Sequence, residues 1–130
     1  MLERWYEYDD SNIPIDTYEV SEIVQNSEGT IIKLVGKENN IDVIFGFVDS
    51  LRITDEGRRI RTYNEVAGIQ KYRENFVGNP IYKVEQSKYI EWIEKESAGF
   101  CGDVEHYVII TENDLIDIIS TFPPAFEKRY

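Results

Sequence analysis

Apolar side chains alternate along residues 41–53, and this pattern constrains the fold more than any other feature of the chain. Six of them share one parity: Ile41, Val43, Phe45, Phe47, Leu51 and Ile53. Because successive side chains of a β-strand point to opposite faces, the pattern predicts a strand over roughly 41–54 with one apolar face. Arg52 has the opposite parity and is predicted to project from the other face. Gly46 inside the run predicts a bulge or a close backbone approach.

Two turn signals divide the preceding part of the chain into further strands. "NSEGT" at 26–30 and "GKENN" at 36–40 are rich in turn-forming residues. They predict strands over roughly 17–25 and 30–36, although Val20, Ile23 and Val24 would also suit a helix. Such short connections favour antiparallel pairing, because parallel strands need long crossovers.

The middle of the chain predicts two short helices and a strand. "TYNE" at 62–65 is typical of a capping box, with Thr62 as N-cap and Glu65 three residues on, so a helix ending near Gly68 is expected. "IYKV" at 81–84 has the composition of a strand. Ser87 is then expected to cap a helix over "KYIEWIEKES", which Gly99 would end.

The last third predicts a hairpin. "HYVIIT", from residue 106, has high β-propensity, and Asn113-Asp114 favours a turn. "LIDIIS", at 115–120, either returns as the second strand or starts a helix; its isoleucines favour the strand. "FPP" at 122–124 should end that element, because proline has no N–H for a ladder.

These elements together predict an α+β fold. We expect a mainly antiparallel sheet, formed by a meander and a C-terminal hairpin, with one or two short helices. The chain has 130 residues without repeats or linkers, so one domain over 1–130 is expected.

The charge pattern narrows the classes of partner. The net charge is −11 at pH 7; residues 1–30 hold 8 acidic and 1 basic side chain, and residues 91–130 hold 9 and 3. Such a field repels nucleic acids and anionic membranes and attracts basic partners, although charge also simply keeps proteins soluble. The single cysteine permits no intrachain disulfide, and the acidic start "MLERWYEYDD" is unlike a signal peptide. We therefore expect a cytoplasmic protein.

No motif in the chain indicates a reaction. His106 has the parity of Val108 and Ile110, so it is interpreted as a satisfied core or rim residue. Cys101 has no cationic neighbour in the sequence that would stabilise a thiolate. Asp114 and Asp117 could be proposed as an acid–base pair, but a solvated face explains them more simply. We predict no catalytic residue, no metal site and no cofactor.

The charged stretch "SLRITDEGRRI" at 50–60 allows two interpretations. Asp55-Glu56-Gly57 lies where the chain leaves the predicted strand, so Arg52 and these carboxylates could form a charge-paired strand exit. They could instead anchor a ligand on the second face of the sheet. In that alternative the protein is a small α+β enzyme or small-molecule-binding module, with Arg52, His106 and Cys101 around one pocket. It requires Arg52 and His106 to lie close together beside a concave site.

Three stretches carry a resemblance to a known class of protein: "VIFGFVDSLRITDEGRRI", "YKVEQSKYIEWIEKESAG" and "HYVIITENDLIDIISTFPPAFE". Together they resemble small bacterial immunity proteins of polymorphic toxin systems. The resemblance implies a cytosolic, non-enzymatic protein that binds one cognate toxin and blocks it. It carries no binding residues with it, because no defined binding motif is available to match.

Residues for such a contact can be suggested from the sequence. A toxin that attacks nucleic acid has a basic working surface, which an acidic protein with exposed aromatic side chains can cover. In "ERWYEYDD", Trp5, Tyr6 and Tyr8 are expected as anchors, and Glu7, Asp9 and Asp10 as steering charges. Asp55 and Glu56 and the acidic C-terminal third would add to this surface. The stretch at 3–10 could equally be an edge strand or a frayed terminus, and the oligomeric state stays open.

Overall fold

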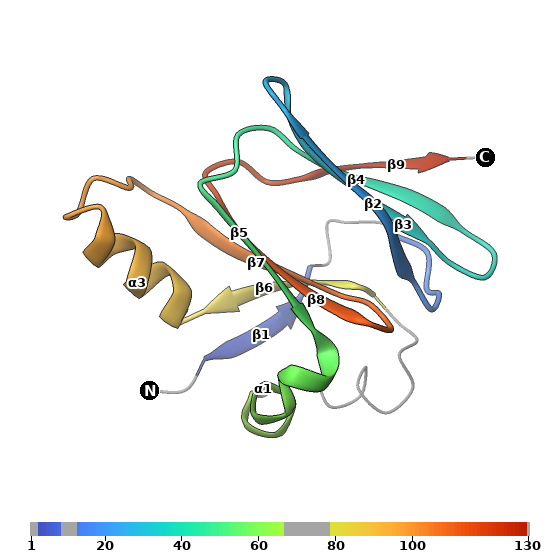
Figure 1. The fold of residues 1–130 in the computed structure, drawn as a ribbon, viewed down its shortest axis with the longest axis horizontal. Coiled ribbons are helices and arrows are strands. Elements are labelled where there is room, and N and C mark those ends of the chain that lie inside the picture. The colour runs from blue at the N-terminus through green and yellow to red at the C-terminus, as the bar shows by residue number, and fades with distance from the viewer. Residues whose placement is uncertain (1–2, 9–12, 67–78, 130) are drawn as a thin grey trace.

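The computed structural model describes residues 3–8, 13–66 and 79–129, in which two antiparallel sheets pack face to face (Figure 1). One sheet has five strands in the order β1-β6-β7-β8-β5, and the other has four in the order β2-β3-β4-β9. This arrangement confirms the predicted α+β class with mainly antiparallel sheets. The elements are β1 (Arg4–Glu7), β2 (Glu19–Asn26), β3 (Gly29–Val35), β4 (Asn40–Phe45), β5 (Ser50–Asp55), η2 (Glu56–Arg58), α1 (Ile60–Glu65), β6 (Ile81–Glu85), α3 (Lys88–Glu96), β7 (Glu105–Ile110), β8 (Asp114–Ser120) and β9 (Ala125–Arg129).

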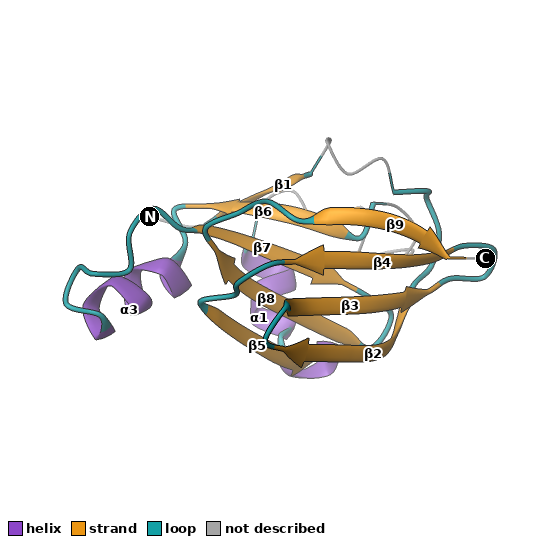
Figure 2. Ribbon diagram, turned by 90° about the horizontal axis from the view of Figure 1, so that it is seen from above, coloured by secondary structure: helices purple, strands orange, loops and turns teal. Residues whose placement is uncertain are grey.

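The main core lies between the two sheets, whose layers overlap in Figure 2. Alternation explains its composition, because every second side chain of a strand points inward. β3 and β4 contribute Ile32, Leu34, Ile41, Val43 and Phe45, and β7 and β8 contribute Tyr107, Ile109, Ile116 and Ile118. A second apolar cluster, including Trp5, Val66 and Leu115, lies on the other face of the five-stranded sheet. We call this the outer face, and it also packs against α3.

The run at 41–54 forms two strands instead of the single one predicted. β4 ends at Phe45 and β5 begins at Ser50 in the other sheet, so the chain crosses between layers at 46–49. Phe47 is 69% exposed in this crossing and leaves the apolar face that its parity predicted. Gly46 lies in the bend at the end of β4. Within β5, Arg52 projects from the outer face as its parity predicted and pairs in register with Asp117. Ile53, predicted on the apolar face, is 52% exposed at this edge strand.

The two predicted helices had different outcomes. The capping box at 62–65 is wrong: α1 begins at Ile60 after Arg59, and Thr62 lies inside the helix, where its Oγ1 accepts a hydrogen bond from Arg59 Nε. The predicted end near Gly68 lies outside the described residues. The second helix is confirmed as α3, because Ser87 Oγ accepts the Ile90 N–H at 3.0 Å. Gly99 closes it with φ of +84° and a hydrogen bond from its N–H to the Glu94 carbonyl.

The C-terminal hairpin is confirmed by β7 and β8, and "LIDIIS" is a strand. β8 ends at Ser120 before the prolines, as expected. A strand that we did not predict follows: β9 pairs with β4 and completes the four-stranded sheet. The ambiguous segment around Val20 and Ile23 is strand β2, with a register shift between Val20 and Glu22.

A buried carboxylate fixes the loop between β3 and β4. Asp16 is 7% exposed and accepts hydrogen bonds from the backbone N–H groups of Thr17, Lys37, Glu38 and Asn39 and from Asn39 Nδ2. Burial alone would raise its pKa, but these donors stabilise the ionised form and lower the pKa to about 2. Gly36 lies so close to this carboxylate that a Cβ there would clash with it.

Candidate functional site

A second buried carboxylate, Asp117, lies at the centre of the outer face. Leu115, Asp117 and Ile119 of β8 alternate with the core residues Ile116 and Ile118, which places Asp117 on the face away from the other sheet. Its cross-strand neighbours are Arg52 on β5 and Val108 on β7. The side chain is fully buried, so its charge must be compensated by other side chains.

Three side chains provide that compensation. His106 Nε2 lies 2.8 Å from Asp117 Oδ1, while Arg59 Nη1 and Arg52 Nε donate to Oδ2 at 2.8 and 3.1 Å. Burial opposes ionisation of Asp117. The hydrogen bond from His106 and the charges of Arg59 and Arg52 outweigh that effect and hold its pKa well below the ordinary value. Asp117 is therefore a permanently charged centre to which β5, β7 and the start of α1 are attached.

His106 extends this network to helix α3. Its Nδ1 lies 2.7 Å from Ser87 Oγ, which is also the N-cap of the helix. Ser, His and Asp are the side chains of a hydrolase triad, but here the serine meets Nδ1 and the carboxylate meets Nε2, the reverse of the protease arrangement. His106 is also only 1% exposed. The prediction of a satisfied core histidine is confirmed, and the three residues join α3 to the sheet.

Tyr89 covers His106 and orients one arginine. The Tyr89 and His106 rings meet edge to face with centroids 5.4 Å apart, and the Tyr89 hydroxyl hydrogen-bonds to Ser50 Oγ. The Arg52 guanidinium carbon lies 4.5 Å from the centroid of the Tyr89 ring. This cation–π contact restricts the position of the Arg52 guanidinium and uses none of its N–H groups.

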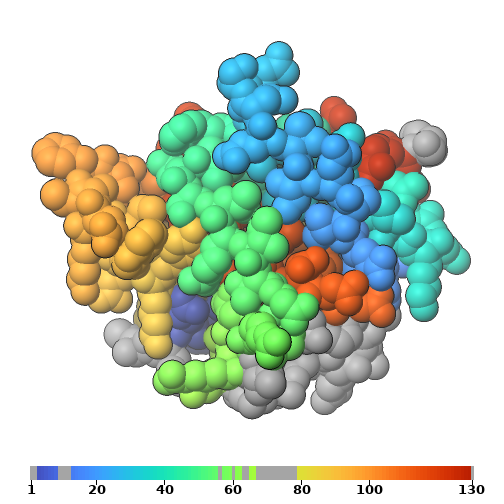
Figure 3. All heavy atoms as spheres, viewed as in Figure 1, coloured from blue at the N-terminus to red at the C-terminus, as the bar shows by residue number. Residues whose placement is uncertain are grey.

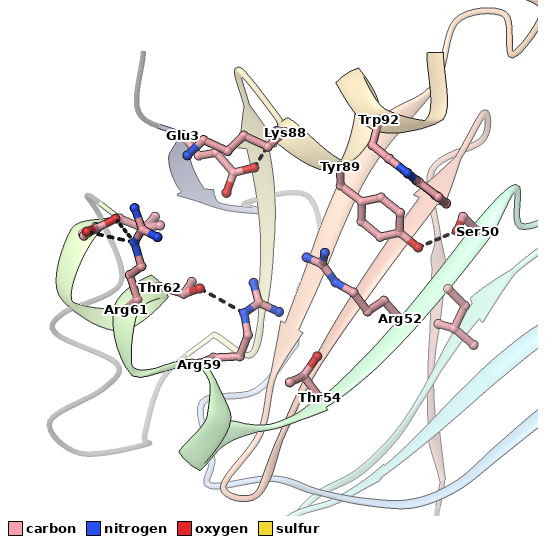
Figure 4. A pocket seen from close by; sticks show the side chains of 13 residues that line it. Glu3, Ser50, Arg52, Thr54, Arg59, Arg61, Thr62, Lys88, Tyr89 and Trp92 are labelled. Carbon is pink, nitrogen blue, oxygen red and sulfur yellow. Dashed lines mark hydrogen bonds and ion pairs between the residues drawn. The ribbon is translucent and has the colours of Figure 1, made fainter. Parts of the chain in front are cut away.

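An open cavity of about 770 Å³ lies over this network, between α1 and α3. Figure 4 shows the guanidinium groups of Arg52 and Arg59 turned toward each other inside it. In the space-filling view of Figure 3, the molecule is hollowed between the segments that carry α1 and α3. The cavity is lined by Glu3, Ser50, Leu51, Arg52, Thr54, Arg59, Arg61, Thr62, Glu65, Val66, Lys88, Tyr89 and Trp92.

Helix α3 also presents an acidic and aromatic surface to solvent. Trp92 is 53% exposed and Phe100, in the turn after the helix, is 91% exposed. Glu91, Glu94 and Glu96 are exposed on the same helix. We call these five residues the α3 surface. Beside it runs a groove of about 590 Å³ between α3 and the ends of β6 and β7, lined by Val84, Glu85, Gln86, Ser87, Ile90, Glu91, Glu94 and Glu105.

The predicted aromatic anchors at the N-terminus are mostly not exposed. Trp5 is 2% exposed and packs against Tyr82, so the prediction of an exposed Trp5 anchor is wrong. Tyr8 is half-buried, with its ring against Tyr107 and Phe126. Tyr6 is 40% exposed, with the Arg4 guanidinium 5.3 Å from its centroid. The alternative interpretation of this stretch as an edge strand is the one observed, because β1 lies at the edge of its sheet.

The predicted carboxylates are dispersed. Glu7 is exposed on β1, whereas Asp9 and Asp10 lie outside the described residues. Asp55 is exposed at the end of β5, where it accepts the Gly57 N–H at 3.0 Å. Glu56 belongs to η2, and its side chain is not among those described.

The alternative site prediction is met in part. Arg52 and His106 are brought together by a shared partner, Asp117, and a concave site lies beside them. Cys101 does not join them: its Sγ donates to the Gly102 carbonyl in the loop after α3, away from the cavity lining. The interpretation of Asp117 as part of a solvated face is wrong.

Two members of the network were missed for identifiable reasons. Asp117 interrupts a run of three isoleucines and a leucine in "LIDIIS", and an acid inside such a buried strand is itself a signal of a compensated charge. Arg59 gave no signal, because its role depends on the way η2 and α1 fold back over the sheet. Among the described residues, no three His, Cys, Asp or Glu side chains gather as metal ligands would.

Comparisons with known proteins give no match. No family model matches the chain, and no curated protein or solved structure matches it. Within the described part of the chain, none of the helices has both the length and the apolar character needed to cross a bilayer.

Proposed function

We propose that this protein binds a basic protein partner through the α3 surface and that, as the immunity-protein resemblance implies, the partner is a toxin domain that it neutralises in the bacterial cytoplasm. The observation that carries the proposal is that α3 and the turn after it expose two large aromatic side chains, Trp92 and Phe100, on the same segment that exposes three glutamates. Large aromatic side chains left in solvent are typical anchors of interfaces, and surrounding charges select and steer the partner.

The charges around the anchors favour a cationic partner. Glu91 pairs with Lys95, whereas Glu94 and Glu96 have no ion pair among the described residues. The adjoining groove adds Glu85 to the negative field, whereas Glu105 is paired with Lys83 at 3.6 Å, and Ile90 gives the groove apolar contact area. A basic helix or loop could place an apolar side chain on Ile90 in the groove while its lysines and arginines face the glutamates.

Neutralisation would follow from occlusion. A domain that cleaves or modifies nucleic acid needs a basic surface to hold the phosphate backbone. A tightly bound acidic protein covers that surface and competes with the nucleic acid. This mode of action requires no reaction by the bound protein.

Co-expression tests the proposal directly. The chain is produced together with each candidate toxin encoded beside its gene, and complexes are measured by size-exclusion chromatography and by association kinetics at two salt concentrations. We expect a one-to-one complex whose association slows at high salt. Glu94→Lys should weaken it by about tenfold or more, since reversal of a close charge costs more than about 1.4 kcal/mol. Phe100→Ala should speed dissociation.

The matched control is Glu127→Lys, which makes the same charge reversal at an exposed position of β9 in the other sheet. It should leave the complex within about twofold of the wild type. The proposal is wrong if no neighbouring toxin forms a complex. If a complex forms but responds equally to Glu94→Lys and Glu127→Lys, the binding surface is not the one proposed.

A further inference from the structure

A different site follows from the cavity over Asp117. We propose that this cavity binds a small carboxylate ligand with a flat apolar body, held by the guanidinium groups of Arg52 and Arg59. The cavity shares Trp92 with the α3 surface but no residue with the acidic groove. The inference goes beyond the proposed protein contact, because its hydrogen-bond donors, Arg52 and Arg59, belong only to the cavity.

The two arginines retain donors after they have bound Asp117. A guanidinium has five N–H groups. Arg52 uses Nε for Asp117, and its two Nη groups have no partner among the described residues. Arg59 uses Nε for Thr62 and Nη1 for Asp117, and its Nη2 has no partner among them. Because the groups face each other inside the cavity (Figure 4), their free edges converge on one place.

Asp117 and Tyr89 hold these donors in position. Asp117 Oδ2 binds both guanidiniums, which fixes their separation, and Tyr89 holds Arg52 by ring stacking. The Arg59 side chain is only 14% exposed. Donors that are ordered before a ligand arrives lose little conformational freedom on binding, so they favour an oxyanion more than mobile surface arginines would.

The local charge selects a monoanion. Four cationic side chains, Arg52, Arg59, Arg61 and Lys88, meet three carboxylates, Glu3, Glu65 and the underlying Asp117, which leaves one net positive charge. Arg61 is already paired with Glu65 at 3.1 Å. A carboxylate matches the remaining charge and the planar, forked geometry of guanidinium. A phosphate dianion would exceed that charge and would face the Glu3 and Glu65 carboxylates.

The walls select an apolar, planar body. Leu51, Val66, Tyr89 and Trp92 line the cavity beside the arginines. Tyr89 and Trp92 have ring centroids 6.0 Å apart, so they form a continuous aromatic wall. The volume of about 770 Å³ lies within the range of small-molecule sites. An aryl carboxylate would place its ring against this wall and its carboxylate between the arginines.

Titration with matched probes tests the inference. The probes are 2-naphthoate, its neutral analogue 2-naphthamide, and 2-naphthyl phosphate, and the signals are the indole N–H of Trp92 and the Arg Nε–H resonances in NMR spectra. We expect saturable one-to-one binding of 2-naphthoate that shifts Trp92 and Arg52. The amide should bind about tenfold or more weakly, because it cannot form charge-assisted hydrogen bonds.

Two conservative variants locate the site. Arg52→Lys retains the charge beside Asp117 but removes the free fork, and it should weaken 2-naphthoate binding by about tenfold. Arg129→Lys is the matched control, since Arg129 forms the corresponding ion pair with Asp42 in the other sheet, and it should bind 2-naphthoate as the wild type does. Both variants are first checked for folding by their amide spectra.

The inference is wrong if 2-naphthoate gives no saturable shift up to about 10 mM, a concentration beyond the range of specific small ligands. It is also wrong if 2-naphthamide binds as tightly as 2-naphthoate, or if folded Arg52→Lys binds 2-naphthoate with unchanged affinity. Tighter binding of 2-naphthyl phosphate would overturn the choice of a carboxylate. These results are measured without a toxin and turn on Arg52 and Arg59, which are not part of the α3 surface, so they can fail while the proposed toxin contact stands.

Discussion

The protein contains two buried aspartates that are stabilised in different ways. Asp16 is held by four backbone N–H groups and one amide, all from its own neighbour and from one short loop. Asp117 is held by the charged or polar side chains of His106, Arg59 and Arg52, which come from three separate elements. Both carboxylates have a lowered pKa. Their surroundings differ in what remains available for another molecule.

The difference separates Asp16, which only holds a loop in place, from Asp117, which orders the donors of the proposed binding site. The N–H groups around Asp16 each have one hydrogen to donate, and that hydrogen is used. The guanidiniums around Asp117 have several, and those left over face a cavity. A buried carboxylate whose partners are guanidinium groups, each with several N–H donors, therefore positions spare donors at a surface, whereas a carboxylate held by backbone N–H groups only closes a loop.

The largest expected effect comes from removing the charge of Asp117. Asp117→Asn retains the shape but leaves Arg59 and Arg52 without a buried counter-charge, so the free energy of unfolding should fall by about 4 kcal/mol. Urea denaturation followed by circular dichroism measures it. Asp114→Asn, at the half-exposed start of β8, should change stability by less than about 0.5 kcal/mol. A loss below about 1 kcal/mol for Asp117→Asn would show that the network contributes little to the fold.

The next effect concerns pH and sharpens the role of Asp16. Its folded-state pKa of about 2 lies below the ordinary 3.8, so between pH 4 and pH 2 the unfolded chain binds more protons than the native protein. The stabilisation is complete above pH 4 and is lost as the pH falls toward 2, amounting to about 2 kcal/mol. Asp16→Asn removes this contribution.

Urea unfolding of both proteins at several pH values from 2 to 6 measures that difference. The stability gap between wild type and Asp16→Asn should narrow as the pH falls through this window. A gap that stays constant would mean that Asp16 has an ordinary pKa in the native protein.

A smaller effect is expected at the connection between Asp117 and α3. Ser87→Ala removes the helix cap and the partner of His106 Nδ1, and it should lower the free energy of unfolding by about 1 kcal/mol. Ser87→Thr can form both hydrogen bonds and should recover most of the loss. If the alanine variant is as stable as the wild type, Ser87 does not join α3 to the network.

Elements with complete local signals were predicted best. Ser87 and Gly99 mark both ends of α3, and the turn at Asn113-Asp114 marks the β7–β8 hairpin. Residues 41–54 could not be divided from parity alone, because β4 and β5 continue the same alternation although they belong to different sheets. Thr62 and Glu65 matched a capping box, but the position of η2 makes Arg59 the residue before α1.

The site was less predictable than the fold. The parity of Arg52 correctly placed it on the outer face, and the alternative interpretation correctly predicted a polar, concave site there. The rest of the network required Asp117 to meet Arg52 and Arg59, which lie 65 and 58 residues away in the sequence, and such contacts leave no local pattern. Trp5 shows the converse limit: an acidic, aromatic stretch looked exposed, but its tryptophan is buried in the apolar cluster on the outer face.

The most direct test of this account is the ionisation of Asp117 itself. Carboxyl carbon shifts of the aspartates, measured by NMR from pH 6 downward, report each carboxylate separately. We predict that Asp117 stays at its ionised shift through the ordinary aspartate range near pH 4 and that Asp16 titrates only near pH 2. An Asp117 midpoint at pH 4 or above would contradict the account, because the arginines would then not be held by a permanent charge.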